Sequence, residues 1–264
     1  MASGKRWTRE ELLIALNLYH KLRFGQFDRK QPVIIDLAKR LKRTSDSVAM
    51  KLSNLASLDP VLKLRGIKGL DGASDLDKEL WSEFHENPAE MVPLSQKQFD
   101  SLFTESRDET TEVLPGTGIR CRKIPPAGET EYKALTKQRR GQDYFREIVL
   151  NNYGGRCGIT GLPIRELLIA SHILPWGSHE KERLNVRNGI CLNRLHDAAF
   201  DQGLIGFDPQ CRVIISAKLR SHFKQSAMDE YFEPHAGKIL ILPSDGILPQ
   251  PDFLATHCKR FALC

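Results

Sequence analysis

Two stretches near the middle of the chain carry its most distinctive pattern: RELLIASHILPW at residues 165–176 and NVRNGICLNRLHDAAFDQGLI at residues 185–205. The first is typical of a short apolar strand that ends in the dipeptide Ser171-His172. In the second, the turn dipeptide Asn188-Gly189 precedes a short apolar segment, which predicts a second strand. A helix that contains His196, Asp197 and Asp201 is then expected. The predicted order is strand, histidine, loop, asparagine, strand and acidic helix.

The flanking residues fit the same small domain. GGRCGITG at residues 154–161 has the glycines of a hairpin turn, and GLIGFDPQCRVIIS at residues 203–216 indicates another hairpin. A helix is expected around residues 132–152, with Phe145, Ile148 and Val149 as its apolar stripe and Arg139 and Arg140 in a basic segment near its start. The expected core of the small domain comprises Leu168, Ile173, Trp176, Leu192, Phe200 and Leu204.

These blocks resemble the HNH (ββα-metal) nuclease superfamily. The patterns C-x-x-T-G, A-x-H-I-x-P-W, N-G-x-x-L and H-D-x-x-F-D-x-G-L-I are similar to a bacterial restriction-type branch of it. The resemblance covers about a quarter of the chain tightly and residues 137–216 more loosely, with the catalytic core at residues 144–215. It implies phosphodiester hydrolysis, which requires a base for water and a cation for the developing charge. It implies that His172 is the base and that Asn188 braces the loop that orients it. A structural strand-end histidine and a simple Asn-Gly turn are the alternatives.

The resemblance also implies a metal site on the helix after the asparagine, with its first ligand about nine positions on. That count reaches Asp197, and Asp201 follows one turn later on the same face. Carboxylates there suit one Mg²⁺ or Mn²⁺ ion. His196 is one position early, so it is expected to contact phosphate, or to be a ligand under another alignment. Ser171 stands where many members of the family carry an acidic or histidine metal ligand, so it is a third candidate for the metal site. As a serine is a poor ligand, water, phosphate or Asp201 would complete the coordination.

The cysteines and the chain's apolar segments set further expectations. The six cysteines form no C-x-x-C pair, and Thr160 stands where the zinc-stapled HNH branch has its second cysteine, so no structural zinc is expected. The chain begins without the apolar region of a signal peptide, and no run is long enough for a membrane span. We therefore expect free thiols, no membrane partner and a cytoplasmic protein.

The N-terminal region predicts a helical DNA-binding module. Thr8 and Glu11 have capping-box spacing, and helices are expected at residues 32–41 and from residue 44 or 45 onward. Two short helices with a tight polar turn resemble a helix-turn-helix. One interpretation places Ser45, Ser47 and Lys51 against DNA. The other is a helical bundle with a solvated basic face.

These patterns predict an α+β protein with three parts. Residues 1–104 form a helical domain, residues 105–131 a linker, and residues 132–264 the HNH domain. The formal charge of +6 makes a polyanionic partner plausible, and the basic candidates for phosphate contact are Arg139, Arg140, Arg187 and Arg194.

The family resemblance implies that the function is cleavage of double-stranded DNA in restriction or defence, including the case in which only modified DNA is cut. A homodimer would allow both strands to be cut. The alternatives are a DNA-binding regulator with a non-cutting HNH fold and a structure-specific or RNA-directed nuclease.

Overall fold

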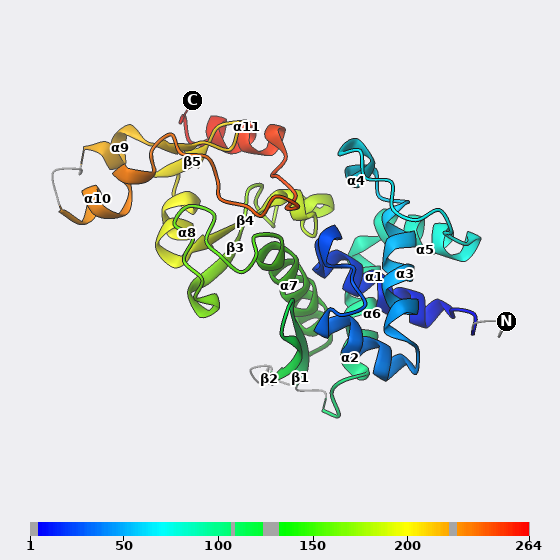
Figure 1. Cartoon of the computed structure of the whole chain (residues 1–264). Coiled ribbons are helices and arrows are strands. Elements are labelled where there is room, and N and C mark those ends of the chain that lie inside the picture. Colours follow the sequence, from blue (N-terminus) through cyan, green and yellow to red (C-terminus); the bar gives the residue numbers. More distant parts are fainter. Residues whose placement is uncertain (1–4, 107–108, 124–131, 222–225, 264) are drawn as a thin grey trace. The chain divides into compact units, whose positions relative to one another are not determined.

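The chain folds into two compact units, residues 1–147 and residues 148–264. The computed structural model describes residues 5–106, 109–123, 132–221 and 226–263. The first unit is mainly helical, whereas the second carries short strands and helices (Figure 1). The architecture is therefore α+β, as the sequence predicts.

In the described residues, six α-helices and the short 3-10 helix η1 (Phe24–Gln26) precede the first strand. The α-helices are α1 (Arg9–Lys21), α2 (Pro32–Leu41), α3 (Ser45–Ala56), α4 (Pro60–Leu64), α5 (Asp75–Glu86) and α6 (Pro88–Ser101). The predicted capping box is present, because Thr8 accepts from the Glu11 amide and Glu11 accepts from the Thr8 amide. Thr44 caps α3 in a similar way by accepting from the backbone of Ser47.

Helices α2 and α3 contact each other. The sharp turn between them needs a left-handed residue, and Lys42 takes that conformation at φ 53°. A glycine is therefore not required there. The apolar residues Val48, Leu52 and Leu55 of α3 are fully buried, as their helical spacing predicts.

A β-hairpin occupies the stretch that was expected to be a linker. Strand β1 (Glu109–Leu114) pairs antiparallel with β2 (Gly118–Lys123), so that Val113 lies opposite Ile119. Strand β1 contacts α6 and β2 contacts α2, which makes the hairpin part of the first unit. The boundary between the units lies instead within α7 (Tyr132–Asn152). Residues 107–108 and 124–131 of the expected linker lie outside the described residues.

The second unit contains the predicted strand–strand–helix arrangement. Strands β3 (Leu168–His172) and β4 (Gly189–Asn193) are antiparallel, with His172 opposite Gly189. Helix α8 (Arg194–Asp201) contacts both strands. The remaining elements are the hairpin of β5 (Ile205–Phe207) and β6 (Val213–Ile215), followed by α9 (Ala217–Arg220), α10 (Ser226–Tyr231) and α11 (Pro251–Arg260).

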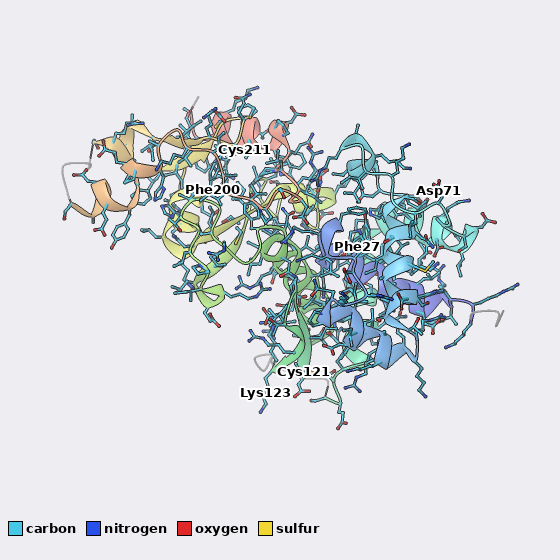
Figure 2. All side chains as sticks on the ribbon, in the orientation of Figure 1. Phe27, Asp71, Cys121, Lys123, Phe200 and Cys211 are labelled. Atoms are coloured by element: carbon cyan, nitrogen blue, oxygen red, sulfur yellow. The ribbon has the colours of Figure 1, made fainter. Side chains whose placement is uncertain are left out.

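The expected core of this unit is largely confirmed. Leu168, Ile173, Leu192 and Phe200 are buried, whereas Trp176 and Leu204 are only partly covered. Figure 2 labels Phe200 and Cys211 of the second unit, which are buried, and Cys121 of the first, which is exposed. Each cysteine that the structure describes is a free thiol. Within the described ranges, no helix combines the length and the apolar character needed to cross a membrane.

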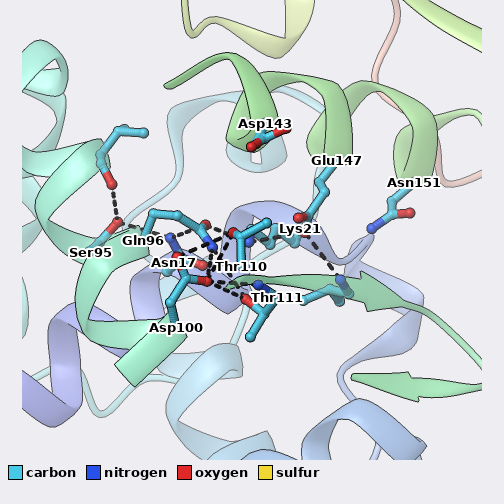
Figure 3. Close-up of polar contacts among 12 residues, drawn as sticks. Asn17, Lys21, Ser95, Gln96, Asp100, Thr110, Thr111, Asp143, Glu147 and Asn151 are labelled. Atoms are coloured by element: carbon cyan, nitrogen blue, oxygen red, sulfur yellow. Dashed lines mark hydrogen bonds and ion pairs between the residues drawn. The ribbon is translucent and has the colours of Figure 1, made fainter. Parts of the chain in front are cut away.

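A buried polar network joins α1, α6, β1 and α7 inside the first unit (Figure 3). The Lys21 side chain is fully buried, and its Nζ lies 2.7 Å from Gln96 Oε1 and 3.0 Å from Glu147 Oε2. Asp100 Oδ1 accepts from the Thr111 amide at 2.9 Å and from the Thr111 hydroxyl at 2.7 Å. The network therefore satisfies the buried threonines of the hairpin and fixes it against α6.

Removing only one residue of the buried Lys21–Glu147 ion pair should strongly destabilise the fold. Burial raises the pKa of Glu147, and the charge of Lys21 opposes that rise. A buried pair gains little over an apolar pair, but one buried charge left without its counter-charge is strongly unfavourable. The two residues should therefore behave as one unit in folding.

We predict that Glu147→Gln and Lys21→Met each lower the free energy of unfolding by about 3–5 kcal/mol. The double variant Lys21→Met/Glu147→Leu should recover much of this loss, because no uncompensated charge stays buried. Urea unfolding of the full chain measures all three. The exposed pair Lys78–Asp75 supplies the control, since Lys78→Met should cost less than about 1 kcal/mol. Single variants no more destabilised than this control would contradict the prediction.

Candidate active site

The imidazole of His172 lies at the end of β3, where the chain enters the loop that leads to β4. Its Nε2 is 3.0 Å from the backbone oxygen of Arg183. A carbonyl oxygen only accepts, so Nε2 carries the hydrogen of the neutral ring and Nδ1 carries the lone pair. Burial lowers the pKa of His172 below its usual value, and the hydrogen bond to Arg183 opposes this. The ring is therefore neutral near pH 7 and can accept a proton.

Asn188 holds both ends of the loop that follows His172. Its side chain is fully buried at the end of the short 3-10 turn η5 (Val186–Asn188). Oδ1 accepts from the Leu174 amide at 2.7 Å, and Nδ2 donates to the oxygens of Leu174 at 3.3 Å and Glu182 at 3.1 Å. Glu182 directly precedes Arg183, whose carbonyl holds His172. The side-chain amide of Asn188 thus fixes the loop around the imidazole.

Two carboxylates lie one turn apart on α8. Asp197 is half-buried and Asp201 is exposed. Burial and the negative charge of Asp197 raise the pKa of Asp201, while Arg260 lowers it. Oxygen donors of this kind match the preference of Mg²⁺ and Mn²⁺.

Ser171 contacts one of these carboxylates directly. Its hydroxyl, on a residue only 2% exposed, donates to Asp197 Oδ1. The hydroxyl is therefore committed to orienting Asp197, and the expectation that Ser171 is itself a metal ligand loses support. Among the residues that the structure describes, no group of three or more His, Cys, Asp or Glu side chains could hold an ion. The donor set fits a hard cation that keeps water and phosphate oxygens as its other ligands.

His196 lies on the buried face of α8 and not beside the carboxylates. It is 2% exposed, its Nε2 is 2.9 Å from the Tyr231 oxygen, and its ring meets Phe232 edge-on at 5.2 Å. The expected phosphate contact is therefore not supported. The sequence did contain a signal for this burial, because Ala199 and Phe200 follow at helical spacing and are also buried.

The structure separates the DNA-contact candidates of α3. Ser45 and Ser47 are partly exposed in its first turn. Lys51 is 8% exposed, and its Nζ lies 2.8 Å from Asp77 Oδ2 and 5.5 Å from the centre of the Trp7 ring. Its role in DNA contact is not supported, because it faces the bundle and its charge is already neutralised there.

The four arginine candidates occupy both units. Arg139 and Arg140 are partly exposed on α7 in the first unit. Arg194 is exposed at the start of α8, while Arg187 Nε donates to the Leu248 oxygen at 3.5 Å. Of the two candidates in the second unit, Arg194 is therefore the more exposed to solvent.

Comparison with known proteins supports the nuclease interpretation of the second unit. Residues 157–208 match the model of the HNH endonuclease family, and this range includes β3, the His172 loop, β4 and α8. No curated protein matches the chain significantly. With the geometry of His172, Asn188 and the α8 carboxylates, this match shows that the chain contains, at residues 157–208, a segment of the HNH endonuclease family.

Proposed function

We propose that the protein is a divalent-metal-dependent DNA endonuclease in which His172 is the general base. The observation that carries the proposal is the geometry of His172. Its Nε2 hydrogen is held by the Arg183 oxygen at 3.0 Å, so Nδ1 is the ring nitrogen that would take the proton of a water molecule. Its neighbour Ser171 contacts Asp197 on α8, which supports a site built from residues of both β3 and α8.

Asp197 and Asp201 are the proposed metal ligands, and Ser171 is a positioning residue that orients Asp197. When bound, the cation would neutralise charge on the scissile phosphate and on the leaving oxygen. Asn188 keeps the loop in place and thereby keeps His172 in the tautomer that accepts from water. No role in the chemistry is proposed for His196, since its ring packs in the core.

The proposed substrate is double-stranded DNA, bound in part by the first unit. Two sets of residues support this proposal. In the first unit they are Ser45 and Ser47 in the partly exposed first turn of α3, and Arg139 and Arg140 on α7. In the second unit they are Arg187 and Arg194.

The proposed biological role is restriction or defence, with cleavage confined to modified DNA as one form of it. One HNH site cuts one strand, so double-strand cleavage requires a homodimer or two successive encounters.

A plasmid assay tests the central proposal. Wild-type protein should convert supercoiled plasmid to nicked or linear forms with Mg²⁺ or Mn²⁺, and EDTA should abolish this. Plain, methylated and hydroxymethylated plasmids are compared. His172→Ala should lower the rate by about 10²–10⁴-fold, the usual contribution of a general base, while His179→Ala in the neighbouring loop should leave it unchanged. If every substrate stays intact with every ion, the nuclease proposal fails and a non-cutting DNA-binding protein is favoured.

The ligand assignment is tested by Asp197→Asn, Asp201→Asn and His196→Gln. Asp197→Asn retains the acceptor for Ser171 but removes the charge, so cleavage should fall at least about 10²-fold at unchanged stability. Asp201→Asn should act in the same direction. His196→Gln disturbs a buried contact, so it should lower the unfolding temperature more than the single-turnover rate. A stable His196→Gln protein that cannot cut, beside an active Asp197→Asn protein, would reverse the assignment.

DNA binding by the first unit is tested in EDTA, where no cleavage occurs. Ser47→Glu places a negative charge on the first turn of α3 and should weaken duplex binding at low salt. Arg139→Gln/Arg140→Gln should reduce the slope of log K against log salt by up to about 2, one per lost phosphate contact. Lys78→Gln on α5, which changes the charge by one unit as Ser47→Glu does, is the control. Affinities equal to this control would make the first unit a scaffold without a DNA-binding face.

A further inference from the structure

Arg183 contacts the loop around His172 through both its backbone and its side chain. Its carbonyl oxygen accepts from His172 Nε2 at 3.0 Å. Its guanidinium reaches back across the loop, where Nε donates to the Trp176 oxygen at 2.6 Å and a terminal nitrogen lies 3.2 Å from Glu180 Oε1. Only 28% of the Arg183 side chain is exposed. The arginine is therefore built into the loop and does not extend freely into solvent.

Trp176 connects the same arginine to the imidazole a second time. The Arg183 guanidinium lies over the indole, 5.3 Å from its centre, which is a cation–π arrangement. The His172 ring meets the indole edge-on at 5.3 Å, with 82° between the planes. The His172 ring is thus held by two contacts: the hydrogen bond to the Arg183 carbonyl and the edge-on packing against the Trp176 indole. Arg183 therefore takes part in both contacts, because its carbonyl binds the imidazole and its guanidinium packs on the indole.

We infer that Arg183 and Trp176 are positioning residues that fix the orientation and tautomer of His172, and that Arg183 is not a phosphate contact. The inference rests on the proposed function of His172 as the base. It adds a second clamp to that of Asn188, which ties Leu174 to Glu182. The clamp of Arg183 ties Trp176 to the carbonyl that receives the imidazole hydrogen.

The chemistry of arginine explains why lysine would not replace it here. A guanidinium can donate from Nε, donate from a terminal nitrogen and stack on an aromatic face at the same time. An ammonium keeps the charge but has no planar fork. Arg183→Lys therefore separates the two interpretations, because a phosphate contact needs mainly the charge, whereas the clamp needs the planar geometry.

Single-turnover cleavage by Arg183→Lys, Trp176→Leu and Trp176→Phe gives the first readout. Arg183→Lys and Trp176→Leu should lower the rate constant at saturating enzyme by about 10–10²-fold, the scale expected for a misplaced catalytic group. The Kd for duplex DNA in EDTA and its salt dependence should stay within about twofold of wild type. Trp176→Phe keeps an aromatic edge and should recover most of the rate. Lys181→Gln, which removes an exposed charge in the same loop, should match wild type.

The ¹⁵N shifts of the His172 ring in the full chain give a readout that does not depend on cleavage. Wild type should show the Nε2–H tautomer, and Arg183→Lys should show a mixture of the two neutral tautomers. Retained rate and tautomer in Arg183→Lys would overturn the inference. So would an unchanged rate constant in Arg183→Gln combined with weaker binding and a salt slope reduced by about 1, which would identify a phosphate contact. If wild-type protein cuts nothing, the proposed function fails, and the tautomer of His172 still decides whether Arg183 positions the ring.

Discussion

The side-chain amide of Asn188 is the constraint on which the geometry around His172 depends. The loop between β3 and β4 has little regular structure, yet it must present one carbonyl to an imidazole at hydrogen-bond distance. A fully buried amide with one acceptor and two donor hydrogens, at the end of this loop, can hold both its entry at Leu174 and its middle at Glu182. A buried amide left partly unsatisfied would be costly, so the loop and the asparagine stabilise each other.

This constraint also explains how local turn chemistry and catalytic geometry can rely on the same residues. Asn188 precedes Gly189, the first residue of β4 and the partner of His172 in the sheet. The backbone at this point therefore sets the register that places His172 at the strand end. Register errors of one residue would move each side chain of β3 to the opposite face. The turn, the strand pairing and the position of the imidazole are consequently fixed together.

Much of the second unit could be predicted from sequence because its signals are local. Apolar strands bounded by Asn-Gly and glycine-rich turns predicted β3 and β4, while the choice of Asp197 on α8 came from the family resemblance. The helices of the first unit were similarly accessible through Thr8, Thr44 and the apolar spacing in α3. In each of these cases the deciding residues are neighbours along the chain, so the pattern itself contains the physical cause.

The remaining features depend on partners that are distant in sequence. Lys51 looks like a surface charge until Asp77, 26 residues away, neutralises it. The threonine-rich stretch after residue 105 looks like a linker until Asp100 satisfies Thr110 and Thr111 and the hairpin becomes part of the core. For His196, the deciding factor was its position along the helix. Its chemical type favoured a site role, but its position on the apolar face of α8 decided its burial.

The serine at position 171 has a consequence for how the proposed metal would be held. A carboxylate or histidine there would add a protein ligand, whereas a serine that donates to Asp197 adds only orientation. The proposed site then offers two carboxylates from the described residues, and burial together with the negative charge of Asp197 raises the pKa of Asp201. Such a site holds a free ion less tightly than one with three protein ligands, and it leaves more positions for phosphate oxygens. In the proposed mechanism, metal and DNA would therefore bind cooperatively, because each supplies ligands or charge that the other needs.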